Sequence, residues 1–387
     1  MAIQKINIEE FLELAKHHPV IDVRSPGEYS HAQIPSAYSL PLFSDEERKQ
    51  VGTAYKQQSR EAAIKIGLDF FGVKMSRMVE EAEHIVSRFS LTEESNLTTG
   101  NSQRETRNVL VHCWRGGMRS AAVAWLLDMY GFKIYVLAGG YKAYRKWVLA
   151  QFEKNYIFNI IGGYTGSGKT LLLQELAKQN KTIIDLEALA NHKGSAFGAL
   201  GEKPQPGQEM FENMLAEKLQ DTGDRRQDTG YRIQDNDFQN PASGIRHPVS
   251  GIYIEDESQR IGNLQLPMPL WNTMRKSPVY FIDIPFEKRL DYITADYGKQ
   301  EKEKLMEAII RIQKRLGGLE TKNAIQYVAE DDLKSCFRIL LSYYDKCYYK
   351  GLHNRENLLT LLNKIPCSSV DTETNTQKLL SCNTVNG

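Results

Sequence analysis

Residues 108–131 read NVLVHCWRGGMRSAAVAWLLDMYG, and this stretch decides the fold of the first part of the chain. The apolar run NVLVHCW predicts a buried strand, and AAVAWLLDMY predicts a helix that ends at Gly131, a residue type favoured at helix C-caps. Outward from this stretch, VIDV at 20–23 and KIYVLAGG at 133–140 predict two more strands. Strands that alternate with helices favour a parallel sheet with helices on its faces.

The loop that carries Cys113 has the features of a reactive thiolate site. Loop N–H groups and the first turn of the next helix converge on the sulfur and form an anion-binding concavity. We expect these groups, with Arg115 and Arg119, to lower the thiol pKa and make the thiolate a nucleophile. Gly116 and Gly117 let the backbone approach a ligand closely. The alternative is an inert buried cysteine, which does not account for the glycines and arginines beside it.

A second motif, GYTGSGKT at 163–170, lies between the strand segment YIFNIIGG and the helix segment LLLQELAKQ. It fits G-x-x-x-x-G-K-T, whose amides cradle phosphate oxygens, whose lysine reaches the terminal phosphate and whose threonine can hold Mg²⁺. The motif leaves open whether the ligand is ATP or another phosphate compound. The candidate phosphate-binding residues are Gly163, Gly166, Ser167, Gly168, Lys169 and Thr170, with Thr170 as the candidate Mg²⁺ ligand.

Carboxylates end two further apolar segments of this half, IIDLE at 183–187 and GIYIEDE at 251–257. Such a carboxylate can orient Mg²⁺ or act as a base, and the alternative for each is a solvated acid at a strand end. The polar segment NHKGSAFG at 191–198 predicts a substrate loop, with a surface turn as the alternative. The candidate residues of these segments are Asp185, Glu187, His192, Ser195, Glu255 and Asp256.

Length and composition indicate a globular protein of two or three domains, since the chain has 387 residues and a typical domain has about 150. Lysine and arginine number 49 against 48 acids, so any nucleic-acid contact must come from a local basic patch. Five cysteines without a C-x-x-C pair disfavour a disulfide framework and a zinc ribbon. We expect a cytoplasmic protein without a membrane segment, because the N-terminus is acidic and no apolar run approaches ~20 residues.

The patterns divide the chain into four parts. We predict a first α/β domain over 1–150, a P-loop α/β domain over 151–285, a helical region over 286–362 and a flexible tail over 363–387. Polar, unpatterned segments at 91–107 and near 220–248 predict solvated insertions. Within the helical region, the spacing of Arg311, Lys314 and Arg315 places three cations on one helical face, either as an RNA contact or as an ordinary solvated face.

The first domain resembles the rhodanese family through DVRSPGEYSHAQIPSA at 22–37 and the Cys113 loop. In that family the cysteine carries a chalcogen as a persulfide. The loop also fits H-C-x-x-G-x-x-R-S of tyrosine phosphatases, and Cys113 to Arg119 spans seven residues, as in the phosphatase branch of the rhodanese superfamily. A loop of this length has room for a phosphate-type oxyanion, which suits a phosphatase or a chalcogen donor that is itself a phosphate.

From about residue 8 to about 352 the chain resembles the tRNA 2-selenouridine synthase family, through LPLFSDEERKQVGTAYKQ, DLEALANHKGSAFG, IEDESQRIG and YYDKCY. This resemblance implies a rhodanese-like parallel-sheet domain followed by a P-loop NTPase-like α/β domain with a helical C-terminal region. The chain departs from the family pattern at Lys193, where arginine is expected, and at Ser36, where glycine is common. Neither change removes a charge or the thiol.

The resemblance also implies a chemistry. Family members act on wobble 2-thiouridine in tRNAs for Lys, Glu and Gln, alkylate its sulfur with geranyl diphosphate, and replace the geranylthio group with selenium from selenophosphate. Carried over, the diphosphate binds at Lys169 and Thr170, and selenium is held on Cys113 as a selenosulfide beside Arg119. Two other functions stay open: a rhodanese-fold phosphatase fused to a P-loop kinase-like domain, and a P-loop switch protein whose first domain only binds a partner.

Overall fold

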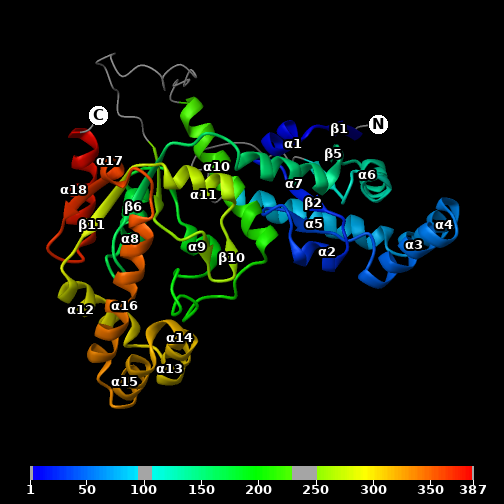
Figure 1. The fold of residues 1–387 in the computed structure, drawn as a ribbon. Helices are drawn as coiled ribbons and strands as arrows, with labels where there is room; N and C mark the ends of the chain where they lie inside the picture. The colour runs from blue at the N-terminus through cyan, green and yellow to red at the C-terminus, as the bar shows by residue number, and fades with distance from the viewer. Residues whose placement is uncertain (1–2, 95–106, 229–250, 386–387) are drawn as a thin grey trace. The chain divides into compact units, whose positions relative to one another are not determined.

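The computed structural model describes residues 3–94, 107–228 and 251–385, and these fall into two compact units, Met1–Ala150 and Gln151–Gly387 (Figure 1). Each unit is built on a five-stranded, wholly parallel sheet with helices around it, so the predicted α/β class is confirmed. Among the described residues, no helix is both long and apolar enough to cross a bilayer.

The sheet of the first unit has the strand order β1-β5-β4-β2-β3. Its strands are β1 (Ile3–Ile6), β2 (Val20–Asp22), β3 (Tyr38–Ser39), β4 (Asn108–His112) and β5 (Lys133–Leu137). Its helices are α1 (Ile8–Ala15), α2 (Pro26–His31), α3 (Asp45–Gln57), α4 (Arg60–Gly72), α5 (Met75–Glu94), α6 (Met118–Tyr130) and α7 (Gly140–Gln151). Because β4 is the central strand, its carboxyl end lies where ligands bind in open parallel sheets.

Local signals explain where these elements begin and end. Val109, Leu110 and Val111 are fully buried, as expected for a parallel strand covered on both faces. Helix α6 ends at Gly131, whose φ of 109° is the left-handed conformation that favours glycine. Helix α3 begins with a capping box in which the Ser44 hydroxyl accepts from the N–H three residues on. The core of this unit lies between the sheet and helices α5 and α6.

The sheet of the second unit has the order β12-β11-β6-β8-β7. Its strands are β6 (Phe158–Gly162), β7 (Ile183–Ile184), β8 (Ile252–Glu255), β11 (Val279–Asp283) and β12 (Leu362–Pro366), and β9 (Arg260–Ile261) pairs antiparallel with β10 (Leu264–Gln265). The helices before residue 285 are α8 (Lys169–Lys178), α9 (Leu186–Ala190), α10 (Gln208–Asp228) and α11 (Met268–Arg275). The later helices are α12 (Phe286–Tyr297), α13 (Lys302–Arg311), α14 (Gln313–Leu316), α15 (Gly318–Ala329), α16 (Leu333–His353), α17 (Leu358–Leu361) and α18 (Thr372–Val385).

The structure differs from the sequence predictions in the C-terminal segment. We expected a flexible tail over 363–387, but β12 completes the sheet beside β11, and α18 packs against α8. The physical reason is apolar burial, because Ile365 and Leu379 are buried in the same core cluster as Leu172 and Leu176. Most of the two polar insertions, residues 95–106 and 229–250, lies outside the described residues.

Candidate active sites

Cys113 lies directly after β4 and before α6, as the sequence predicted. Its side chain is 3% exposed, at the bottom of the loop. The loop depends on glycine, since a side chain on Gly140 would clash with the Cys113 carbonyl oxygen, and Gly116 has a φ of 63°. The start of α7 also supports the loop, because the Tyr141 N–H donates to the Cys113 carbonyl at 2.8 Å. The thiol is therefore held in a fixed backbone cradle.

The cradle stabilises the thiolate. Burial by itself raises the pKa of Cys113, but the Ser120 hydroxyl and the N–H groups of Arg115, Ser120 and Gly117 outweigh it, and the net pKa is lowered. The Ser120 hydroxyl oxygen lies 3.3 Å from Sγ. We expected the guanidinium groups of Arg115 and Arg119 to contribute to the lower pKa of Cys113. The structure instead assigns the lowering to backbone N–H groups and one hydroxyl, and the Arg115 side chain is exposed.

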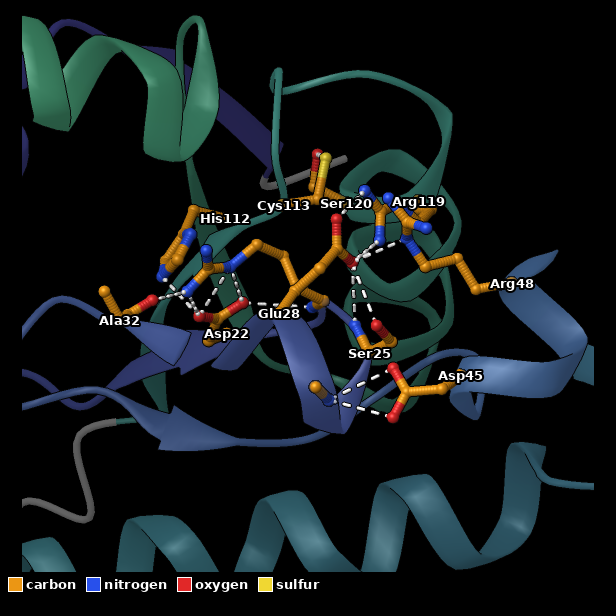
Figure 2. Close-up of polar contacts among 12 residues, drawn as sticks. Asp22, Ser25, Glu28, Ala32, Asp45, Arg48, His112, Cys113, Arg119 and Ser120 are labelled. Carbon is orange, nitrogen blue, oxygen red and sulfur yellow. Dashed lines mark hydrogen bonds and ion pairs between the residues drawn. The ribbon is translucent and has the colours of Figure 1, made fainter. Parts of the chain in front are cut away.

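Arg119 is directed at a carboxylate (Figure 2). Its Nη1 donates to Glu28 Oε2 at 2.6 Å and its Nη2 to Oε1 at 3.3 Å, and Arg48 Nε lies 3.1 Å from the same Oε2. Burial raises the pKa of Glu28, but Arg119, the Ser25 N–H and Arg48 outweigh it and bring the pKa down to about 2. Glu28 is therefore ionised throughout the physiological pH range. Sequence reasoning missed Glu28, which is 91 residues from its partner.

A buried ion pair lies under the loop. Arg24 donates to both carboxylate oxygens of Asp22 at 2.6 to 3.0 Å and to the Ala32 carbonyl at 2.7 Å, and both charged side chains are at most 1% exposed. The guanidinium also stacks 3.8 Å from the centre of the Tyr141 ring. His112 Nε2 is 3.7 Å from Asp22, and burial lowers the pKa of this histidine, which keeps it neutral. The string DVR at 22–24 contains both residues of this ion pair and is the sequence feature that could have predicted it.

The second unit contains the phosphate loop between β6 and α8, which is the context that the motif requires. Lys169 Nζ donates to the Gly163 carbonyl at 3.3 Å. The Thr170 hydroxyl lies 3.0 Å from Glu187 Oε2 and 2.8 Å from Glu255 Oε1. Ser167 Oγ is buried without a hydrogen-bond partner among the described residues. The loop thus presents a free hydroxyl and a lysine where a phosphate group would bind.

Three carboxylates gather beside the Thr170 hydroxyl. Glu187, Glu255 and Glu257 each offer an oxygen, and these oxygens lie within 4.8 Å of one another. Burial and the neighbouring carboxylates raise the pKa of Glu255 well above its usual value, and burial with Glu187 raises the pKa of Glu257 to about 8. Carboxylate and hydroxyl oxygens are the donors that Mg²⁺ prefers, so these residues fit a divalent cation. Asp185 instead caps α9, accepting from the Ala188 N–H at 2.8 Å.

Helix α16 contacts the phosphate loop through Tyr348. The Gly163 N–H donates to the Tyr348 hydroxyl at 3.1 Å, and that hydroxyl donates to Asp256 at 2.7 Å. Arg355 Nη2 donates to the other Asp256 oxygen at 2.6 Å. The predicted candidate Asp256 is thus engaged in supporting the loop through Tyr348. No sequence signal predicted this contact, because Tyr348 and Gly163 are 185 residues apart.

A cavity of about 1260 Å³ opens in front of the phosphate loop and brings most of the remaining candidates together. His192 and Ser195 line it, and burial followed by the charge of Arg311 lowers the pKa of His192. Aromatic side chains of the helical region, Tyr297 and Tyr344 among them, also line it. Residues of the predicted phosphate, acid and substrate segments therefore share one cavity within this unit. The aromatic side chains on its wall are Trp271, Tyr292, Tyr297, Tyr343, Tyr344 and Tyr348.

The three cations predicted to share one helical face are divided between two helices. Arg311 ends α13, whereas Lys314 and Arg315 belong to α14, because Ile312 leaves the helical conformation with φ −101° and ψ 2°. All three cations are exposed. Arg315 lines the cavity in front of the phosphate loop, beside Tyr343.

Comparison with known proteins gave consistent matches. The model of the tRNA 2-selenouridine synthase AAA domain matches residues 157–235 and 243–365, and that of the rhodanese-like domain matches 74–147. A tRNA 2-selenouridine synthase of Sulfurovum sp. (strain NBC37-1) is 34% identical over 82% of this chain and 80% of its own. That of Bdellovibrio bacteriovorus is 31% identical over 92% and 94%, and that of Serratia proteamaculans is 36% identical over 72% and 64%.

Proposed function

The chain belongs to the tRNA 2-selenouridine synthase family of tRNA-modifying enzymes, and from that premise we propose that it converts wobble 2-thiouridine to 2-selenouridine through an S-geranyl intermediate. The proposed substrates are tRNAs for Lys, Glu and Gln, with geranyl diphosphate and selenophosphate as donors. The observation that carries the proposal is the presence in one chain of a stabilised thiolate and of a phosphate-loop cavity. With tRNA as the substrate, we propose a cytoplasmic location for the reaction.

The first proposed step takes place in the cavity of the second unit. The 2-thio sulfur attacks C1 of geranyl diphosphate, the C–S bond forms, the C–O bond breaks, and diphosphate leaves. The loop amides and Lys169 are placed to bind the diphosphate. The carboxylates beside Thr170 would hold Mg²⁺, which when bound neutralises charge on the leaving group. The aromatic wall supplies apolar surface for the geranyl chain and a stacking surface for the base.

The second proposed step replaces sulfur with selenium. The P–Se bond of selenophosphate breaks as a nucleophile attacks phosphorus, the selenide released attacks C2 of the base, the C–Se bond forms, the C–S bond breaks, and geranylthiolate leaves and is protonated by water. We assign Cys113 to the release of selenium from its donor, because its lowered thiol pKa makes it a nucleophile at neutral pH. Its thiolate attacks phosphorus, the S–P bond forms as the P–Se bond breaks, and water then hydrolyses the S–P bond so that phosphate leaves. Backbone N–H groups that stabilise a thiolate also suit the oxyanion of a phosphate group attached to the same sulfur.

The test is nucleoside analysis by mass spectrometry of tRNA from cells that lack the gene and carry one of three versions of the chain. Wild type should restore 2-selenouridine, and Cys113→Ser should not, with geranylthiouridine accumulating. Cys382→Ser is the matched control, because this cysteine lies in α18 of the other unit and outside the lining of the phosphate-loop cavity, and it should behave as wild type. If wild type leaves the wobble uridine unchanged, the proposal is wrong.

The seven-residue Cys113–Arg119 loop favours a second candidate, a phosphatase fused to a P-loop kinase-like domain. In that case Cys113 would form a phosphocysteine and Lys169 would bind ATP. Release of phosphate from an aryl phosphate by wild type, but not by Cys113→Ser, would support this function. Selenation without such hydrolysis would exclude it.

A further inference from the structure

The pairing of Glu28 with Arg119 bears on which anions the Cys113 loop accepts. Arg119 is at the end of a loop long enough for a tetrahedral oxyanion, and a guanidinium at that position binds such an anion through two parallel hydrogen bonds. Both terminal nitrogens of Arg119 already contact the Glu28 carboxylate, at 2.6 and 3.3 Å. A phosphate group that used these nitrogens would have to displace a carboxylate that is only 12% exposed.

The carboxylate is held firmly where it is. It also accepts from the Ser25 N–H at 3.0 Å, which completes the capping box of α2, and it pairs with Arg48 of α3. Figure 2 shows the carboxylate at the meeting point of Ser25, Arg48 and Arg119. With its pKa near 2, Glu28 does not release Arg119 by protonation at any physiological pH. The charge of Glu28 cancels one of the two guanidinium charges that it contacts.

The thiolate itself does not depend on Arg119. Its pKa is lowered by Ser120 and by backbone N–H groups, which would remain available to an anion carried on the sulfur. We propose that Glu28 is a specificity-determining residue of the Cys113 loop: by occupying Arg119 it keeps the affinity of the loop for inorganic phosphate and phosphate monoesters low. For the proposed selenophosphate donor, this lets the phosphate leave after transfer, and that purpose alone rests on the proposed function.

The experiment measures how well inorganic phosphate protects Cys113 of the full chain from iodoacetamide, with the Cys113 peptide followed by mass spectrometry. We expect phosphate to protect Glu28→Gln at concentrations at least about tenfold lower than wild type, because one charged hydrogen-bonding group is released. Glutamine keeps an acceptor for the Ser25 N–H, so the capping box is retained. A thermal unfolding scan checks that the variant folds.

Asp45→Asn is the matched control. Asp45 accepts from the Gly27 N–H in the same region, the substitution changes the net charge by the same amount, and the Glu28–Arg119 pair stays intact. Equal protection of wild type and Glu28→Gln overturns the proposal, as does weaker protection of Glu28→Gln, which would mean that Glu28 orients Arg119 toward phosphate. A gain in Asp45→Asn as large as in Glu28→Gln also overturns it, because net charge would then be the cause.

The role proposed for Glu28 and the proposed function can be refuted independently of each other. The protection assay uses neither tRNA nor selenium, so it reports on the loop alone. A wild-type chain that restores 2-selenouridine but is strongly protected by phosphate refutes only the role of Glu28. A chain that shows the predicted protection but does not modify tRNA refutes only the proposed function.

Discussion

Replacing Arg24 by methionine should sharply destabilise the first unit. Arg24 and Asp22 are almost completely buried, and the methionine would leave the Asp22 carboxylate without its partner. Breaking a buried ion pair by removing one partner costs about 3–5 kcal/mol. The lost bond to the Ala32 carbonyl and the lost stacking on Tyr141 place the expected value in the upper part of that range.

The double variant Asp22→Asn/Arg24→Met makes the test sharper. Without a buried charge left behind, it should be less destabilised than Arg24→Met alone by at least about 1 kcal/mol. The control Lys16→Met breaks the exposed Lys16–Glu13 pair of the same unit and should change stability by no more than about 0.5 kcal/mol.

The assay is urea unfolding of the full chain followed by tryptophan fluorescence. Trp114, Trp125 and Trp147 report on the first unit, and Trp271 reports on the second. A loss of less than about 1 kcal/mol in Arg24→Met, or a double variant no more stable than Arg24→Met, would refute the prediction. Either result would mean that the pair is not the support of the loop that its burial indicates.

Four further predictions concern the two sites. Ser120→Ala removes a hydrogen bond to the Cys113 thiolate, so the rate of Cys113 alkylation at neutral pH should fall about tenfold. Peptide mass spectrometry measures this rate. An unchanged rate would contradict the role of Ser120 in lowering the thiol pKa. Tyr348→Phe removes the acceptor of the Gly163 N–H, so the affinity for pyrophosphate, measured by calorimetry, should weaken about tenfold. The far-ultraviolet circular dichroism spectrum should stay unchanged. Undiminished affinity would show that the phosphate loop does not need the Tyr348 hydroxyl. Glu257, with its pKa raised to about 8, must lose its proton to bind a cation, so Mg²⁺ affinity should rise from pH 6 to pH 8 with proton release, seen by calorimetry in two buffers. For the same reason the metal-free chain should lose stability as pH rises from about 4.5 toward 8, and Mg²⁺ should restore it; a flat profile in unfolding assays would refute the cluster.

The local parts of both sites could be predicted from the sequence. The strand, loop and helix around Cys113, and those around Lys169, follow from apolar runs and glycines that are adjacent in the chain. Long-range partners could not be predicted in this way. Glu28 meets Arg119 across 91 residues, and Tyr348 meets Gly163 across 185, and no local pattern encodes such pairings.

Some predictions made from the sequence were wrong because packing or backbone geometry outweighed the local sequence pattern. Composition suggested a frayed C-terminus, but a few apolar side chains, Ile365 and Leu379 among them, are enough to fix β12 and α18 onto the sheet. The apolar segment at 183–187 forms a strand only over Ile183–Ile184, because Asp185 begins a helix as its N-cap. The cationic face over 311–315 was broken by Ile312, whose backbone separates two short helices.

The strand order of the second unit has a consequence for synthesis of the chain. Strand β6, which leads into the phosphate loop, pairs with β8 and β11, and β12 closes the edge beyond β11 only at Pro366. A nascent chain therefore carries β6 with both edges unpaired until much later segments leave the ribosome, and such non-local pairing folds slowly. Exposed strand edges recruit other chains. Premature termination before β12 should accordingly yield aggregates, so a soluble chain requires synthesis of this last strand.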